Sequence, residues 1–211
     1  MSEKSKHFHY GEDKLTAGVA LEIVQGLRKG VIADKAARRI DASRDAVQSI
    51  VERGETVYGI NTGFGPLCTT VISPGDTRQL QYNILKSHSA GVGEHVPAEI
   101  AQLMMVLKVH ALAKGYSGIS RATLERIIWH IENKITPIVP SQGSVGASGD
   151  LAPLAHLFLP LIGLGQVLYN GEIVETRVVL QHYELEPLEL GPKEGLALIN
   201  GTQFIASFAV K

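Results

Sequence analysis

The segment GSVGASGDLAPLAH, from Gly143 to His156, joins a glycine-rich loop to an apolar run. Its glycines let the backbone adopt positive φ angles that other residues adopt only at a cost. From Leu151 to Gly165 the chain is apolar except for His156, and two prolines interrupt it. That stretch is shorter than the about 20 residues that cross a membrane. The pattern therefore predicts a buried helix beside a functional loop, and no membrane span.

Familiar chemistries of glycine-rich loops do not fit this segment. No Gly-Lys-Ser/Thr follows any glycine cluster of the chain, and no G-x-G-x-x-G opens a helix after a strand. The run Gly146-Ala147-Ser148-Gly149 is followed by Asp150, so the G-x-S-x-G pattern of serine hydrolases is absent as well. Phosphate binding and serine-hydrolase chemistry are poorly supported.

Ala147, Ser148 and Gly149 suggest a different chemistry. In a tightly bent backbone, the amide nitrogen of Gly149 can attack the carbonyl carbon of Ala147 and close a five-membered ring. Glycine has no Cβ to obstruct this approach. Loss of water from the ring closure, and then of the Ser148 hydroxyl with its α-proton, leaves a methylidene-imidazolone, which is a strong electrophile. Ala-Ser-Gly alone is a common tripeptide that usually forms a flexible loop.

Three further segments accompany this one: YGINTGFG at 58–65, SHSAGVG at 87–93 and NGTQ at 200–203. With GSVGASGDLAPLAH, they make the chain resemble the aromatic amino acid ammonia-lyase and aminomutase family. Members of that family form a methylidene-imidazolone from Ala-Ser-Gly. The four motifs occur in the family's order and span nearly the whole chain, which is far more specific than any one of them.

The resemblance implies a role for each matched residue. Residues 147–149 become the prosthetic group, so no external cofactor is needed, and Asp150 with the helix that begins there supports the loop. Tyr58 matches the catalytic base. Asn200 matches the asparagine that contacts the prosthetic group and the substrate, and Gln203 belongs to the same motif. A tyrosine titrates near 10, so Tyr58 can act as base only where donors or positive potential favour its phenolate.

The substrate is suggested by Ser87 and His88, the two residues at the start of SHSAGVG. This pair resembles the histidine ammonia-lyase pattern rather than the pairs of phenylalanine and tyrosine enzymes. An imidazole at His88 can exchange hydrogen bonds with a substrate imidazole. Some aminomutases also carry a histidine here, and a histidine near a helix end can simply make a local hydrogen bond.

Composition excludes several other classes. The chain has 211 residues, 20 Lys and Arg against 21 Asp and Glu, and one cysteine, Cys68. The near-neutral charge argues against nucleic-acid binding, and a single cysteine excludes an internal disulfide framework. His88, Glu94 and His95 lie among loop glycines that fix no metal geometry, so we expect no metal site. The polar N-terminus lacks a signal peptide, which favours the cytoplasm.

Helical periodicity dominates the first two thirds of the chain. It predicts four helices: one with Ala20, Ile23, Val24 and Leu27 inward and Gly30 as its cap; one from about Asp34 to Arg53, with Ile40, Val47, Ile50 and Val51 inward and Gly54 closing it; one with Ile100, Leu103, Met104 and Leu107 after Pro97; and one with Leu124, Ile127, Ile128 and Ile131 after Ser120 as N-cap.

The clearest strand signal is QVLYNGEIVE, where Asn170-Gly171 predicts a two-residue hairpin turn. From Gly201 an apolar run opens another expected helix that stops at Lys211 without a cap. The fold class is therefore mainly α with a small β component. By resemblance, residues 1–211 are the N-terminal catalytic portion of a fumarase/aspartase-like helical-bundle fold, with the C-terminal bundle absent.

The function implied by the resemblance is elimination of ammonia from L-histidine to give urocanate, in a homotetramer. A 2,3-aminomutase and a phenylalanine or tyrosine ammonia-lyase are alternatives within the same chemistry. A further alternative is that the 211-residue chain is a truncated, inactive fragment or interaction module. Family members are more than twice as long, and their remaining part supplies further active-site residues. We therefore expect the 211-residue chain alone to lack activity.

Overall fold

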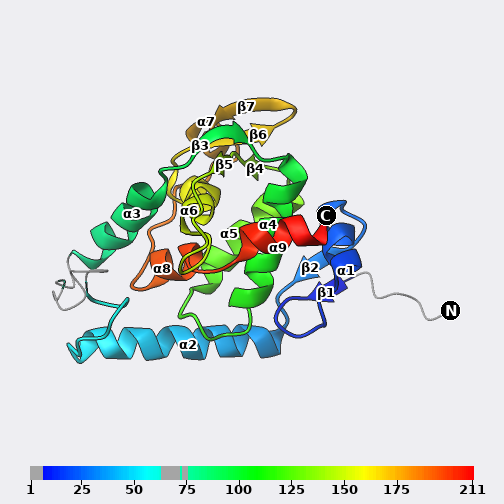
Figure 1. Ribbon diagram of the computed structural model, residues 1–211. Helices are drawn as coiled ribbons and strands as arrows, with labels where there is room; N and C mark the ends of the chain where they lie inside the picture. Colours follow the sequence, from blue (N-terminus) through cyan, green and yellow to red (C-terminus); the bar gives the residue numbers. More distant parts are fainter. Residues whose placement is uncertain (1–6, 63–71, 73–75) are drawn as a thin grey trace.

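A computed structural model describes residues 7–62, 72 and 76–211 (Figure 1). The elements follow one another in this order: β1 (His7–His9), α1 (Ala17–Val24), β2 (Lys29–Val31), α2 (Asp34–Glu52), α3 (Thr77–His88), β3 (Val92–His95), α4 (Ala98–Leu112), α5 (Arg121–Glu132), β4 (Thr136–Pro137), β5 (Pro140–Gln142), α6 (Leu151–Phe158), the 3-10 helix η2 (Leu159–Ile162), β6 (Gln166–Tyr169), β7 (Glu172–Glu175), α7 (Thr176–His182), α8 (Glu194–Ile199) and α9 (Gln203–Val210). The predicted fold class, mainly α with a small β component, is confirmed.

Helix α4 is the centre of the core. It packs against α1, α5 and α9, and α9 crosses it (Figure 1). The predicted inward residues Ile100, Leu103 and Met104 are buried, while Leu107 is only half-buried. Buried residues surround most of the helix rather than one stripe, as expected for a helix enclosed by other elements.

Helices α2 and α5 agree with their predicted patterns. Helix α2 ends at Glu52, and Gly54 follows with a φ of 66°. Its predicted inward residues Ile40 and Val47 are buried, and residues 50 and 51 are half-buried. Ser120 caps α5 as expected, because its Oγ accepts the backbone N–H of Thr123 at 3.2 Å.

The prediction for the first helix was wrong at its end. Helix α1 stops at Val24, and Gly26 takes a left-handed conformation with a φ of 77°. Leu27 is therefore outside the helix and 74% exposed. Gly30 lies in β2 opposite Phe8 rather than capping a helix. The helical spacing of apolar residues continues past Gly26 to Leu27. Gly26, four residues before Gly30, adopts the left-handed conformation that ends the helix.

The strands form small separate sheets. Strands β1 and β2 are parallel, β3 and β5 are antiparallel, and β4, β6 and β7 form an antiparallel sheet in that order. The predicted hairpin is confirmed: Tyr169 pairs with Glu172, and the two turn residues Asn170 and Gly171 have φ angles of 51° and 86°. Positive φ at both positions is the type I′ geometry that favours Asn-Gly.

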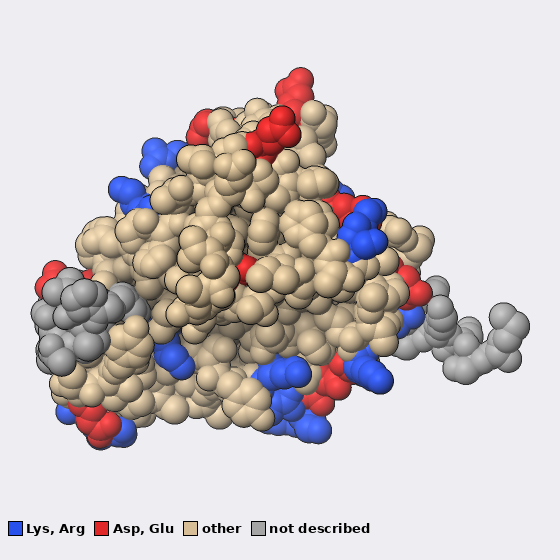
Figure 2. All heavy atoms as spheres, in the orientation of Figure 1, with Lys and Arg blue, Asp and Glu red and all other residues tan. Residues whose placement is uncertain are grey.

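The apolar stretch after Asp150 forms α6 and η2 and ends at Gly163, whose φ is 73°. Most of its side chains are buried, as predicted. No helix among the described residues is long and apolar enough to cross a membrane. The predicted last helix is α9, where Ile205 and Phe208 are about half exposed. The middle of the face over α6, α8 and α9 shows few charged side chains (Figure 2).

Candidate functional site

The Ala147-Ser148-Gly149 tripeptide forms a strained bend at the surface. Ala147 and Ser148 are exposed, Ser148 has a φ of 60°, and Gly149 has a φ of 108°. A non-glycine residue in the left-handed region carries a conformational cost that the surroundings must offset. A Cβ at Gly149 would lie 2.5 Å from the carbonyl oxygen of Gly201. Only glycine fits between Ser148 and the NGTQ segment.

Asp150 connects this bend to the last helix. Its backbone N–H donates to the carbonyl of Gly201 at 2.7 Å. One carboxylate oxygen accepts the backbone N–H of Ile205 at 3.1 Å, and the other accepts the hydroxyl of Ser144 at 3.0 Å. Although Asp150 immediately precedes α6, its fully buried carboxylate caps the N-terminus of α9. The tripeptide is thereby attached to both α6 and α9.

The SHSAGVG segment lies against the other end of the loop. Strand β3 pairs with β5, and a Cβ at Gly143 would lie 3.0 Å from the α-carbon of Gly91. The backbone N–H of Gly91 donates to Nε2 of His156 at 3.0 Å. His156 must therefore be neutral with its proton on Nδ1, and burial lowers its pKa, which favours the neutral form.

Asn200 and Gln203 line a cavity of about 210 Å³, together with Lys108 and Leu196. Asn200 ends α8, and its backbone carbonyl accepts Nζ of Lys108 at 2.7 Å. The Gln203 side chain folds back over Gly201, where it would meet any added Cβ. The NGTQ motif therefore lies between the tripeptide and a buried lysine.

Tyr58 lies in a separate loop, between α2 and α3. The hydroxyl-bearing side chain is 58% exposed, and the next residue, Gly59, has a φ of 77°. A Cβ at Gly59 would lie 2.5 Å from Cδ2 of Leu196, which also lines the cavity beside Asn200. The Tyr58 loop therefore packs on α8. Gly63, Phe64 and Gly65 of the same motif, as well as Cys68, lie outside the described residues.

His88 ends α3 with its ring turned back onto its own helix. Its Nδ1 donates to the carbonyl of Ile84 at 2.9 Å and lies 3.1 Å from Oγ of Ser87. Among the residues that the structure describes, the hydrogen bonds of this ring are local to the end of α3. His88 is connected to the loop that carries the tripeptide through the backbone, because Gly91 of the same segment packs against Gly143.

The residues fit the prosthetic group that the sequence implies. The backbone bends at Ser148, which has a positive φ, and Gly149 has no Cβ to obstruct the approach of its nitrogen to the Ala147 carbonyl carbon. Within the described parts of the chain, no three His, Cys, Asp or Glu side chains are grouped as a metal site would need.

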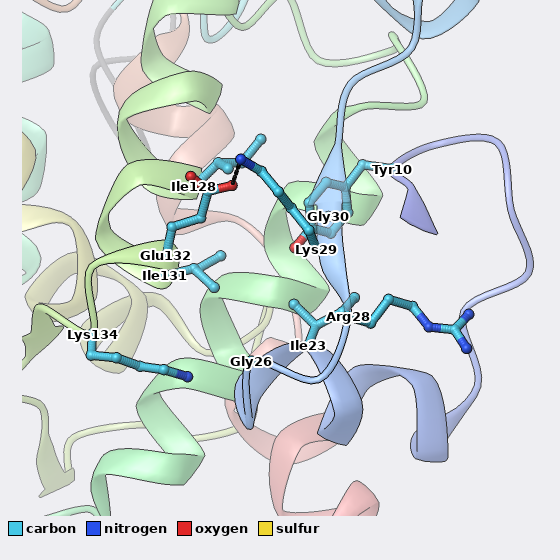
Figure 3. A pocket seen from close by; sticks show the side chains of 10 residues that line it. All are labelled: Tyr10, Ile23, Gly26, Arg28, Lys29, Gly30, Ile128, Ile131, Glu132 and Lys134. Atoms are coloured by element: carbon cyan, nitrogen blue, oxygen red, sulfur yellow. Dashed lines mark ion pairs between the residues drawn. The ribbon is translucent and has the colours of Figure 1, made fainter. Parts of the chain in front are cut away.

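A second cavity, of about 260 Å³, lies between β2 and α5 (Figure 3). Its charged residues have partners in the protein: Lys29 pairs with Glu132 at 3.2 Å, and Lys134 donates to the carbonyl of Val24. Among the described residues, the buried hydroxyl of Tyr10 has no hydrogen-bond partner. This cavity contains none of the predicted site residues, so we assign it no part in the site.

Two contributors to the site were missed in the sequence. Lys108 interrupts the apolar stretch MMVLKVHAL, and a cation inside an apolar helical stretch is a signal of a buried charge with a partner. His156 is the second, because it accepts a hydrogen bond from the SHSAGVG segment. No local sequence pattern indicates the hydrogen bond between Gly91 and His156.

Comparisons with curated proteins give consistent relatives. Histidine ammonia-lyase of Staphylococcus saprophyticus is 47% identical over 179 residues, covering 85% of this chain and 36% of that protein. The Vibrio cholerae histidine ammonia-lyase is 50% identical over 172 residues, covering 82% of this chain and 34% of that protein. The chain therefore spans little more than a third of the length of these relatives.

Solved structures show the same fold. Histidine ammonia-lyase from Trypanosoma cruzi superposes with a TM-score of 0.87 at 39% identity, over 97% of this chain and 39% of that one. Tyrosine aminomutase from Streptomyces globisporus gives 0.88 at 35% identity, over 94% of this chain and 37% of that one. The family model described as aromatic amino acid lyase matches residues 15–211. The resemblance carried by the four motifs is confirmed, and the chain belongs to the aromatic amino acid lyase family.

Proposed function

We propose that residues 1–211 are the N-terminal catalytic portion of a longer ammonia-lyase that converts L-histidine to urocanate and ammonia. The observation that carries the proposal is the packing of Gly149 against Gly201, which brings the Ala-Ser-Gly tripeptide and the Asn200 motif into direct contact. The histidine ammonia-lyases among the relatives, at 47% and 50% identity, support the reaction.

The tripeptide 147–149 is the proposed source of a methylidene-imidazolone, which supplies an electrophile that makes the substrate amine a better leaving group. The chain's own residues supply the rest. Asp150 holds the bend against α9, and Asn200 orients the substrate beside it. Tyr58 removes the β-proton, and the N-terminal end of α6 adds positive potential near the tripeptide. Gln203 supports Asn200 from the same cavity.

His88 is the proposed selector of the substrate ring. An imidazole that already donates from Nδ1 to Ile84 is held as the Nδ1–H tautomer, which leaves an acceptor character on Nε2 for a substrate imidazole N–H. A phenyl or phenol ring offers no such N–H. A phenol O–H could also donate to Nε2, so this tautomer supports histidine over phenylalanine, and the histidine ammonia-lyases among the relatives support histidine over tyrosine.

A second candidate function is a 2,3-aminomutase that returns the ammonia to the β-carbon. The observation that favours it is the likeness to the tyrosine aminomutase structure, with a TM-score of 0.88. Product analysis separates the two reactions, because a mutase yields a β-amino acid and little free ammonia. We also propose that the whole enzyme acts as a homotetramer in the cytoplasm, without metal or external cofactor, and that the 211-residue chain alone is inactive.

The test uses the longest polypeptide that the gene encodes, with the purified 211-residue chain beside it. We expect the long form to release urocanate and ammonia from L-histidine. Tyr58→Phe should lower kcat by about a hundredfold or more, as loss of a general base does. Tyr169→Phe, in the distant hairpin, is the matched control. Absence of turnover with L-histidine by the long form would overturn the proposal, and turnover by the 211-residue chain would overturn its expected inactivity.

A further inference from the structure

Lys108 is a buried cation for which the proposed reaction has no use. Its side chain is 1% exposed in α4, where Met104, Met105 and Leu112 are also buried. Burial lowers its pKa to about 7. In the part of the chain that the structure describes, no carboxylate forms an ion pair with it. Burying an unpaired ammonium is costly, and a hydrogen-bond acceptor at Nζ offsets part of that cost.

The hydrogen bond of Lys108 is directed at the NGTQ motif. Its Nζ donates to the backbone carbonyl of Asn200 at 2.7 Å, a contact between residues 92 positions apart. This carbonyl belongs to Asn200, the extended residue that directly follows the last turn of α8, and it has no partner within the helix. A hydrogen bond from a charged donor is stronger than one between neutral groups. Lys108 therefore fixes the point at which the chain leaves α8.

The next peptide carries the effect to the tripeptide. The carbonyl of Gly201 accepts the N–H of Asp150 at 2.7 Å and lies against Gly149. The peptide held by Lys108 and the peptide that holds Asp150 are consecutive. A shift of Asn200 would therefore move Gly201 and loosen its contact with the bend.

We propose that Lys108 is a positioning residue, whose Nζ hydrogen bond holds the Asn200–Gly201 segment against Gly149 and Asp150 and so keeps the tripeptide bent for ring closure. This role rests on the proposed function, because it treats residues 147–149 as the source of the prosthetic group. The positioning role needs no contact between Lys108 and the substrate, because Lys108 acts on the tripeptide through Asn200 and Gly201.

The experiment compares the wild-type chain with Lys108→Met, Lys108→Arg and the control Lys114→Met, which removes an exposed lysine just after the same helix. Hydrogen exchange of the Asp150 amide is measured by NMR, and the intact mass shows whether two waters have been lost. We expect Lys108→Met to raise Asp150 exchange about tenfold, the effect of losing one charge-assisted hydrogen bond. Amides of α2 should keep their exchange rates, Lys108→Arg should restore protection, and Lys114→Met should resemble the wild type.

The two measurements separate the two claims. Equal Asp150 exchange in wild type and Lys108→Met overturns the positioning role, whatever the mass shows. Exchange that rises only at Asp150 and its neighbours supports the positioning role, even where no form of the chain loses two waters. The absence of that mass loss in every form would count against ring closure in this chain, and not against the positioning role. Where the wild type does lose two waters, the cyclised fraction of Lys108→Met should fall several-fold. If Lys108→Met does not fold, folded Lys108→Arg is the test. Loss of exchange protection at the Asp150 amide in that variant would overturn the positioning role, and protection equal to that of the wild type would support it.

Discussion

The backbone N–H of Asp150 donates to the carbonyl oxygen of Gly201 at 2.7 Å, across 51 positions of sequence. This bond joins two motifs that the sequence presents separately. It runs beside the contact between Gly149 and Gly201, and the Asp150 carboxylate extends the connection to Ile205 in α9. The bend of the tripeptide is therefore stabilised mainly by contacts from outside its own loop.

The first prediction concerns the carboxylate of Asp150. Asp150→Ala leaves the backbone N–H of Ile205 without its acceptor and should lower the free energy of unfolding by about 1–3 kcal/mol. Asp150→Asn keeps one acceptor oxygen, so it should cost about 1 kcal/mol or less. Ser144→Ala removes only the hydrogen bond from the Ser144 hydroxyl to Asp150, so it measures the contribution of that hydrogen bond by itself. Urea denaturation measures all three, and equal stability of the alanine and asparagine variants would contradict the capping role.

The second prediction compares two glycines of the same loop. Gly149→Ala places a Cβ 2.5 Å from Gly201, whereas a Cβ at Gly146 meets nothing within 4 Å. Both glycines have positive φ, so each substitution carries a conformational cost of roughly 1–2 kcal/mol. Gly149→Ala should cost more in urea denaturation and should abolish the loss of two waters in intact-mass measurements. Retained cyclisation in Gly149→Ala would show that the close approach to Gly201 is not required.

Local signals explain what could be predicted from the sequence. The hairpin at Asn170-Gly171 and the Ser120 cap depend on residues within three positions of each other, and both are present in the structure. The order of the four motifs indicated the family, and the family model matches residues 15–211. The wrong end of the first helix also has a local cause, because Gly26 acted as a terminator inside an apolar spacing that continued to Leu27.

The contacts that build the site are not local, and the sequence could not indicate them. The Asp150 carboxylate reaches Ile205, 55 positions away, and Lys108 reaches Asn200, 92 positions away. Asp150 stands where a cap of α6 is expected, yet its side chain caps α9. Such choices are decided by how the helices pack against one another. The roles of Tyr58, His88, Asn200 and Gln203 remain predictions that only measurements of the reaction can test.

The third prediction uses the second cavity. The Tyr10 hydroxyl is buried against Gly30 and finds no hydrogen-bond partner within residues 7–62, 72 and 76–211 (Figure 3). Burial raises its pKa, so it stays protonated. A buried unsatisfied hydroxyl costs about 1–3 kcal/mol. Tyr10→Phe removes only that group and should raise the free energy of unfolding by about 1 kcal/mol. The exposed Tyr116→Phe should change it by less than about 0.5 kcal/mol. A destabilised Tyr10→Phe would mean that the hydroxyl has a partner after all.

The last prediction concerns pH. His130 is buried in α5, its Nδ1 donates to the carbonyl of Ile135 at 3.3 Å, and burial lowers its pKa to about 4. Its pKa in the unfolded chain is near 6.5, so the unfolded state binds the proton first as the pH falls. The stability that the neutral imidazole contributes is complete above pH 6.5 and is lost between pH 6.5 and about 4.

This loss amounts to about 3 kcal/mol when the difference between the two pKa values is converted to free energy. His130→Leu gives up the hydrogen bond to Ile135, so at pH 7 it should be less stable than the wild type by about 1 kcal/mol. It has no imidazole to protonate, so its disadvantage should shrink and then reverse by pH 4.5. Burial also lowers the pKa values of His110 and His156, so the free energy of unfolding of His130→Leu should still fall somewhat as the pH falls. Urea denaturation from pH 4.5 to 7.5 measures this, with the exposed His182→Asn as control. Parallel stability curves for wild type and His130→Leu would show that His130 does not cause the acid sensitivity.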